Sequence, residues 1–209
     1  MTPHTIPRSS ARRAWSAYAT DGTCWEASAW PCWRSWRSWV PSAPAPSAPS
    51  PGAATTPAAV TVCFTPGGNC TDTIVKVLND TKRTIRVQAY SLTSAPIAKA
   101  LLDAHNRGVQ VQVILDKSQR TEQYSSADFL ANQGVPMMID AAHAIAQNKV
   151  MVIDGEMVLT GSFNFTKAAQ NQNAENLLIL RDPALATQYT QNWEAHRQHS
   201  QPYIGRGVR

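Results

Sequence analysis

Hydrophobic and polar positions follow a regular pattern along most of the chain. Residues 84–91 (TIRVQAYS) and 109–115 (VQVQVIL) alternate with the two-residue period of β-strands. Apolar residues three and four positions apart predict a helix that Thr71 caps, with Ile74, Val77 and Leu78 on one face. The first part of this region therefore alternates strands with helices.

The rest of this region continues the pattern and then changes to hairpins. Asp154-Gly155 is a hairpin turn signal between two apolar runs. The other predicted elements are strands over 60–64, 135–139, 148–153, 157–160 and 175–180 and helices over 95–106, 126–133 and 183–199. This order predicts a mixed α/β fold in which helices flank a central β-sheet.

Residues 1–59 have a different composition. Six of the seven Trp and nine of the fourteen Pro of the chain lie before residue 61, without a strand or helix period. We expect a disordered Trp-rich leader and a Pro/Ala/Ser-rich linker, typical of an over-extended start or a misread frame. A corrupted export signal, or a Trp-Arg patch for membranes or nucleic acid, is the alternative. The folded domain is expected over 60–209.

Charge and hydropathy exclude a transmembrane helix but do not select a function. Hydrophobic residues make up 43% and charged residues 16%, a globular composition, and no apolar run is long enough for a spanning helix. The leader contributes +3 of the net charge of +5, so the predicted domain is only mildly basic. Charge alone therefore does not select a nucleic acid as the partner.

Cysteine placement bears on the compartment. Cys63 and Cys70 flank a short turn, TPGGN, and are close enough to bridge a strand end to a helix start. A disulfide there predicts a periplasmic or secreted protein, whereas two free thiols in the cytosol are the alternative. Cys24 and Cys32 lie in the leader. No CxxC or HExxH motif indicates a metal, and no cofactor is expected.

The densest chemical signal lies in residues 143–176. Lys149 interrupts an apolar strand, and Ser162, Asn164 and Thr166 alternate with two Phe in GSFNFT. Glu175 opens the next strand. One cation, neutral donors and a carboxylate without an acidic cluster suit a phosphate held without a metal. The alternative is that these residues have no binding function. Lys149 would then be an ordinary strand lysine whose ammonium reaches solvent, and SFNFT an ordinary amphipathic strand.

These residues resemble the motif of the phospholipase D superfamily, His-x-Lys-x4-Asp followed by Gly-Ser/Gly-x-Asn. The matching positions are Lys149, Asp154, Gly161, Ser162 and Asn164. The likeness covers roughly residues 60–203 and is greatest to small single-motif bacterial endonucleases of that superfamily. Segments 87–101, 160–169 and the Glu-Asn pair 175–176 also resemble them.

The resemblance implies a metal-free phosphodiesterase that forms a phosphohistidine. A homodimer would supply two motif histidines, one as nucleophile and one as acid, and pairs of Lys149 and Asn164 would hold the phosphate with Ser162. Glu175 corresponds to the carboxylate that orients the nucleophile. Asp154 is expected at a turn, in a structural role. Nucleic acid, most often DNA, is the implied substrate.

One departure from the motif is serious, because Gln147 stands where the nucleophilic histidine belongs. An amide has no nucleophilic lone pair at neutral pH, so binding can survive while turnover is lost. His143 lies four extended residues, about 13 Å, away and is not expected to replace it. It is expected to match a residue often found there in relatives. The other histidines of the domain, His105, His196 and His199, are expected on helix surfaces.

Three functions follow from these observations. The first is a dimeric endonuclease impaired at Gln147, and the second is a nucleic-acid-binding module without catalysis. The third is a phospholipase D acting on phospholipid, which is disfavoured because residues 60–209 show no obvious apolar docking patch.

Overall fold

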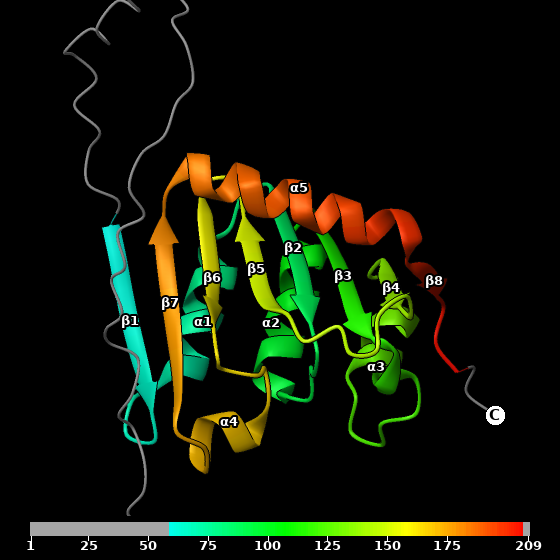
Figure 1. The fold of residues 1–209 in the computed structure, drawn as a ribbon, viewed down its shortest axis with the longest axis horizontal. Helices are drawn as coiled ribbons and strands as arrows, with labels where there is room; N and C mark the ends of the chain where they lie inside the picture. The colour runs from blue at the N-terminus through cyan, green and yellow to red at the C-terminus, as the bar shows by residue number, and fades with distance from the viewer. Residues whose placement is uncertain (1–58, 207–209) are drawn as a thin grey trace, which may run out of the picture. The chain divides into compact units, whose positions relative to one another are not determined.

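The computed structural model describes residues 59–206, which form an eight-stranded mixed sheet in the order β1-β7-β6-β5-β2-β3-β4-β8 (Figure 1). The strands are β1 (Ala59–Thr65), β2 (Thr84–Ala89), β3 (Gln110–Asp116), β4 (Met137–Asp140), β5 (Lys149–Ile153), β6 (Met157–Gly161), β7 (Glu175–Arg181) and β8 (Gln201–Tyr203). The helices are α1 (Cys70–Asp80), α2 (Ala95–Asn106), α3 (Ala127–Asn132), α4 (Lys167–Asn171) and α5 (Pro183–His199), with a 3-10 turn η1 (Lys117–Arg120). This architecture confirms the predicted fold class.

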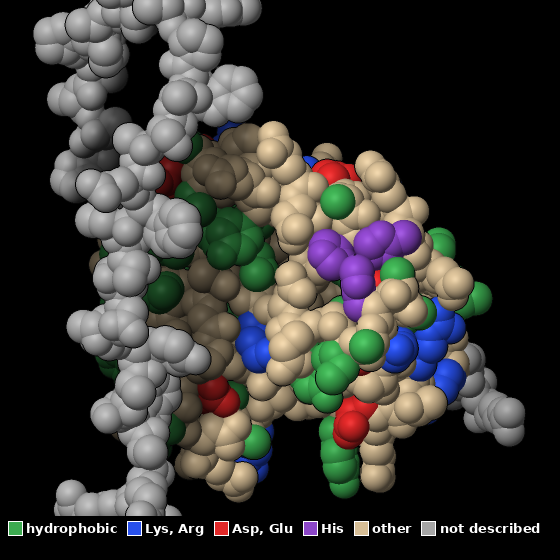
Figure 2. Space-filling model, viewed as in Figure 1, with side chains coloured by type: hydrophobic (Ala, Val, Ile, Leu, Met, Phe, Trp, Pro, Cys, Tyr) green, Lys and Arg blue, Asp and Glu red, His purple; other side chains and the backbone are tan. Residues whose placement is uncertain are grey.

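Helices cover both faces of the sheet. The helices α1 and α2 lie behind it in Figure 1, and α5 crosses the front, where Ala186 packs against Val150, Val152 and Val158. Figure 2, seen from the same side, shows histidine side chains gathered near the end of α5. None of the helices in residues 59–206 has the length and apolar content needed to cross a membrane.

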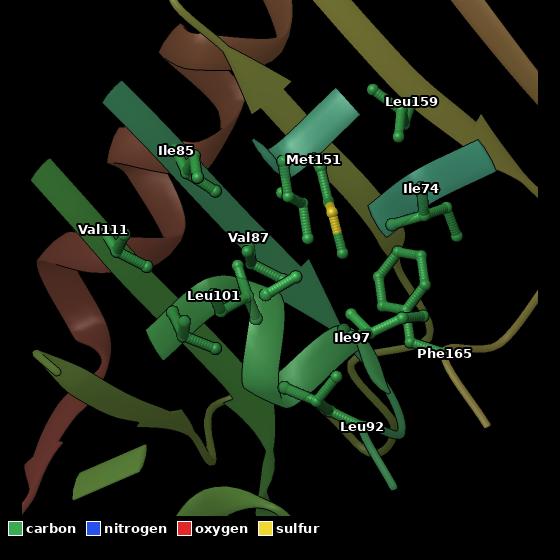
Figure 3. Packing of buried hydrophobic residues seen from close by; sticks show 14 of the residues in the cluster. Ile74, Ile85, Val87, Leu92, Ile97, Leu101, Val111, Met151, Leu159 and Phe165 are labelled. Atoms are coloured by element: carbon green, nitrogen blue, oxygen red, sulfur yellow. The ribbon is translucent and has the colours of Figure 1, made fainter. Parts of the chain in front are cut away.

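The main core lies between the sheet and the helices α1 and α2. Ile74 and Leu101 are fully buried there against strand residues such as Val87 and Met151, and the ring of Phe165 closes one end of the cluster (Figure 3). The apolar run of β5 is explained by this sandwich, because its successive side chains enter the core on opposite faces of the sheet.

The structure corrects the predicted ends of some elements. Asn69, rather than Thr71, is the N-cap of α1, and its side chain accepts a hydrogen bond from the Asp72 amide. Three short elements, η1, α4 and β8, were not predicted because each is too short to show a hydrophobic period. The predicted leader, residues 1–59, lies outside the described residues except for Ala59, as do Cys24 and Cys32.

The Cys63–Cys70 disulfide is present and links the end region of β1 to the first residue of α1. The turn that it spans approaches β1 closely, since a Cβ on Gly68 would lie 2.3 Å from the carbonyl oxygen of Phe64. The bridge confirms the predicted pairing.

Candidate functional site

The antiparallel order of the neighbouring strands brings the predicted site residues other than Asp154 to one edge of the sheet. Lys149 begins β5 and pairs with Ala89 at the end of β2, while Gly161 ends β6 and pairs with Leu177 near the start of β7. Starts and ends of adjacent antiparallel strands lie at the same edge. Strand pairing therefore brings the motif segments together, although they are separated along the chain.

Lys149 is a partly desolvated cation at this edge. Its Nζ donates a hydrogen bond to the backbone oxygen of Gln147 at 2.8 Å and lies 5.6 Å from the centre of the Tyr90 ring. Burial lowers the pKa of Lys149, and the charge of Glu175 opposes this change. An incompletely hydrated ammonium attracts an anion more strongly than a fully solvated one does, because the local dielectric constant is lower.

Glu175 is held by hydrogen bonds on both carboxylate oxygens. Ser162 Oγ donates to Oε2 at 2.6 Å and Asn173 Nδ2 donates to Oε1 at 2.9 Å. Ser162 Oγ in turn accepts from the backbone amide of Asn176 at 3.0 Å. The only hydroxyl proton of Ser162 is thus engaged, and in this state it positions Glu175 instead of pointing a donor at a phosphate, as the sequence had suggested.

The GSFNFT segment is not a regular strand after Gly161, but its side chains alternate between buried and more exposed positions as predicted. Phe163 and Phe165 are buried, whereas Ser162 is exposed and Asn164 is half-buried. Asn164 Oδ1 is buried and has no hydrogen-bond partner among the described residues. A buried amide atom without a partner costs free energy, and that cost disappears if a ligand or a second subunit supplies the partner.

Gly161 is required by the backbone at this point. Its φ is +150°, and a Cβ there would lie 2.3 Å from the carbonyl oxygen of Asn176. The same carbonyl accepts hydrogen bonds from the amides of Ser162 and Phe163, both at 3.1 Å. The glycine thus allows β7 to hold the first residues of the motif segment.

The loop 141–148 between β4 and β5 presents Gln147 to solvent while its backbone is fixed. Asp116 Oδ2 accepts a hydrogen bond from the Ala146 amide at 2.7 Å, and the Tyr90 amide donates to the carbonyl of Asn148 at 2.8 Å. Burial tends to raise the pKa of Asp116, but hydrogen bonds from Ser118 and Ala146 lower it overall. Residue 147 is therefore exposed on an anchored segment.

Asp154 lies at the β5–β6 turn, away from this edge, with a φ of +54°. Its carboxylate accepts hydrogen bonds from the amides of Lys82 (3.1 Å), Arg83 (2.7 Å) and Thr84 (2.8 Å). Burial tends to raise the pKa of Asp154, yet these amides lower it overall. These contacts agree with a structural role, since the carboxylate ties the hairpin to β2.

Comparison with known proteins agrees with this geometry. Residues 74–197 match the family model of the cardiolipin synthase, PLD-like domain. The chain belongs to this phospholipase D-like family. Its matched region contains Gln147, Lys149, Asp154, Gly161 and the residues that hold Glu175, so the unusual glutamine lies within an otherwise complete motif.

Relatives of this phospholipase D-like chain carry several names. A phospholipase D of Rickettsia conorii is 42% identical over 134 residues, which are 64% of this chain and 67% of the relative. A mitochondrial cardiolipin hydrolase of Chlamydomonas reinhardtii is 33% identical over 117 residues, 56% of this chain and 52% of the relative. The chain thus spans about half of that hydrolase.

Among solved structures, Nuc of Salmonella typhimurium, a phospholipase D family member, superimposes with a TM-score of 0.68 at 34% identity. The match covers 70% of this chain and 98% of Nuc. NucT of Helicobacter pylori matches with a TM-score of 0.64 at 21% identity, which supports the fold alone. By family, the chain is a phospholipase D-superfamily phosphodiesterase.

Sequence reasoning missed Tyr90, whose partner Lys149 lies on a neighbouring strand, and Asn173, which lies in a loop without a recognisable pattern. It placed His196 and His199 on a helix surface, where His199 is indeed exposed, but it missed that His196 is mostly buried and that both rings face one carboxylate. His196 Nδ1 lies 2.7 Å from the buried Asp140 Oδ2, and His199 Nε2 lies 3.3 Å from the same oxygen. The HRQH spacing at the end of α5 was the available signal, since residues three apart share a helix face.

Proposed function

We propose that this edge binds a nucleic-acid phosphodiester, and that two copies of the chain meet there to form a metal-independent endonuclease site impaired by Gln147. The partly desolvated Lys149 ammonium, beside Tyr90 and Glu175, is the observation that carries the proposal. The amide side chains of Gln147 and Asn164 complete the set, since amides and ammonium groups suit phosphate oxygens.

The expected reaction needs a nucleophile that the chain lacks. In the family mechanism, an imidazole nitrogen attacks phosphorus, the P–O bond to the leaving group breaks, and a second imidazole protonates the departing oxygen. Gln147 can donate a hydrogen bond to phosphate but cannot attack or exchange a proton at neutral pH. Binding is therefore retained, and the covalent step is disabled.

A homodimer is proposed because the chain contains one copy of the motif. An isologous contact would place each Lys149 and Asn164 opposite its own copy, so one phosphate would meet two of each. The unpartnered Oδ1 of Asn164 supports a contact there. The disulfide Cys63–Cys70 supports a periplasmic or secreted location, where such bonds persist.

Restoration of the histidine tests the catalytic proposal. The full chain and its Gln147→His variant are incubated with plasmid DNA, with and without EDTA. We expect nicking by the variant that EDTA does not abolish, and a rate for the parent chain lower by several orders of magnitude. The matched control Gln147→His/Lys149→Met should lose this gain, because it lacks the phosphate-binding cation.

Two outcomes would overturn the proposal. One is a Gln147→His variant that folds but cleaves neither DNA nor phospholipid. The other is DNA binding by the parent chain that is absent or independent of salt, since phosphate contacts release counterions and must weaken as salt rises. Salt-dependent binding without any gain of cleavage would favour the binding module instead.

Phospholipid hydrolysis is the second candidate because the structure contains an apolar groove that the sequence did not reveal. Thr93, Leu102, Tyr124 and Phe129 contribute to its lining. Its volume is about 800 Å³. Faster cleavage of cardiolipin vesicles than of DNA by the Gln147→His variant would select this activity.

A further inference from the structure

Four potential metal ligands converge outside the phosphate site. Asp140 ends β4, His143 lies in the loop 141–148, and His196 and His199 occupy the last turn of α5. One ligand atom from each lies within 4.8 Å of the other three. Figure 2 shows the histidine rings together in one surface patch. We propose that this cluster is a structural binding site for one Zn²⁺-like divalent transition-metal ion.

The spacing of the ligand atoms fits such an ion. From Asp140 Oδ2, the distances to the ring nitrogens are 2.7 Å for His196, 3.3 Å for His199 and 3.7 Å for His143. Ligands at the usual zinc distance in a tetrahedron lie about 3.3 Å apart. The four atoms thus already surround a point from which small side-chain movements would bring each into bonding range.

The three rings have the symmetry that a tetrahedral ion requires. Their centres are 5.0 Å apart for His143 and His196, 5.2 Å for His143 and His199, and 5.3 Å for His196 and His199. Three imidazoles on one tetrahedral zinc have centres about 5 Å apart. A nearly equilateral triangle of rings around one carboxylate oxygen is therefore close to the bound arrangement.

Hydrogen bonding alone does not account for this arrangement. The Asp140 side chain is 0% exposed, and its Oδ1 is used by the Ala142 amide at 3.0 Å. Its Oδ2 faces all three rings, and the His143 nitrogen at 3.7 Å is beyond hydrogen-bond range. A cation between the four groups would bond to His143 as well and would neutralise the buried carboxylate.

The donor set indicates the class of ion. Imidazole and carboxylate ligands suit zinc and neighbouring divalent transition metals, whereas magnesium and calcium prefer oxygen alone. Four protein ligands fill a tetrahedral sphere, which is typical of structural sites. Access is open, because the side chains of His143 and His199 are 47% and 38% exposed. Because the four protein ligands would leave no open coordination position, the ion would take no part in phosphodiester chemistry.

The bound ion would connect two parts of the fold. It would join the loop that carries Gln147 to the end of α5, an element that lies much later in the chain. Residues 141–148 are otherwise held by a few hydrogen bonds, so a cross-link would favour one conformation of the loop. The sequence had indicated no metal because the four ligands come from two segments, and 56 residues separate Asp140 from His196.

The test uses the full chain after treatment with EDTA and removal of the chelator. Titration with Zn²⁺ is followed by calorimetry, and thermal unfolding is measured with and without Zn²⁺ at about 100 times the dissociation constant. We expect saturable binding that raises the melting temperature by about 5–10 °C. His196→Ala and, separately, His143→Ala should remove one equivalent of Zn²⁺ and the shift.

His105→Ala is the matched control, because His105 is a partly exposed histidine on α2 outside the cluster and should leave binding unchanged. Titration with Co²⁺ should give the visible absorption of a tetrahedral nitrogen and oxygen site, without thiolate charge transfer. The proposal fails if no equivalent of Zn²⁺ binds, or if folded His196→Ala and His143→Ala variants bind as the parent does. It fails equally if the cobalt site proves to contain thiolate.

Discussion

The structural role that we assign to the motif residue Asp154 can be tested quantitatively. Its carboxylate accepts three backbone hydrogen bonds, two on Oδ1 and one on Oδ2. At this partly exposed site we take about 1 kcal/mol for each bond, within the range measured for single hydrogen bonds. Alanine at φ +54° adds about 1 kcal/mol, because it lacks the short polar side chain that lets aspartate adopt this conformation.

The free energy of unfolding of the Asp154→Ala variant should therefore be about 4 kcal/mol lower than that of the parent. Asp154→Asn keeps an acceptor for two of the amides and tolerates the positive φ, so about 1–2 kcal/mol should be lost. Urea unfolding at pH 7 measures both. With a slope of about 2 kcal/mol/M, the midpoints should fall by about 2 M and by 0.5–1 M respectively.

The stability difference should depend on pH with a definite sign. The pKa of Asp154 is lowered in the folded chain, because the three amides outweigh the effect of burial. Its stabilisation is therefore complete above the pKa of the unfolded chain, about 3.9, and is lost as the pH falls through the lower folded value. The parent and Asp154→Asn should converge in stability in that acidic range.

Two results would refute the structural assignment. One is an Asp154→Ala midpoint within experimental error of the parent. The other is a large loss of activity in the Gln147→His variant. There Asp154→Asn should reduce DNA cleavage per folded molecule by less than about tenfold, because the residue does not touch the reacting atoms. A loss of several orders of magnitude would instead make Asp154 a proton carrier.

Three further predictions concern the framework. Gly161→Ala should cost about 3 kcal/mol or more and weaken DNA binding, because the new Cβ would meet the backbone of β7 at 2.3 Å; urea unfolding and filter binding measure this. Replacement of Cys63 and Cys70 by Ser should cost about 2.5 kcal/mol, as the loop-entropy relation gives for their separation of 7 residues, with the reduced parent chain as the control. Trp193→Phe should cost about 1–3 kcal/mol in the same assay, since its buried ring nitrogen donates to a β2 carbonyl at 2.9 Å, and a neutral result would contradict that role.

Local sequence patterns were sufficient for most of the fold. The bounds of α2 and α5 agree with prediction because each has a proline near its start and a change of composition at its end. The hairpin at Asp154-Gly155 was predictable because a turn with positive φ selects these residues. Only elements without a period, such as α4 and β8, were missed.

The candidate site was predictable in part. Lys149, Asn164 and Glu175 were recognisable because their motif is continuous in sequence, and the structure brings their strands to one edge. The engagement of Ser162 by Glu175 was not, because that contact depends on how β6 pairs with β7. The apolar groove was also missed, because its lining combines residues from α2 with residues around α3.

The sequence by itself determined the family motif and the replacement of its nucleophile by Gln147, and it indicated the pairing of Cys63 with Cys70 that the structure then showed. Each depends on residues that are close along the chain, where spacing and turn chemistry limit the geometry. The tertiary structure alone decided the burial of Asp140 against His196 and His199, since 56 residues separate Asp140 from the nearer of the two. Such contacts depend on the packing of α5 across the sheet, and local spacing carries no information about it.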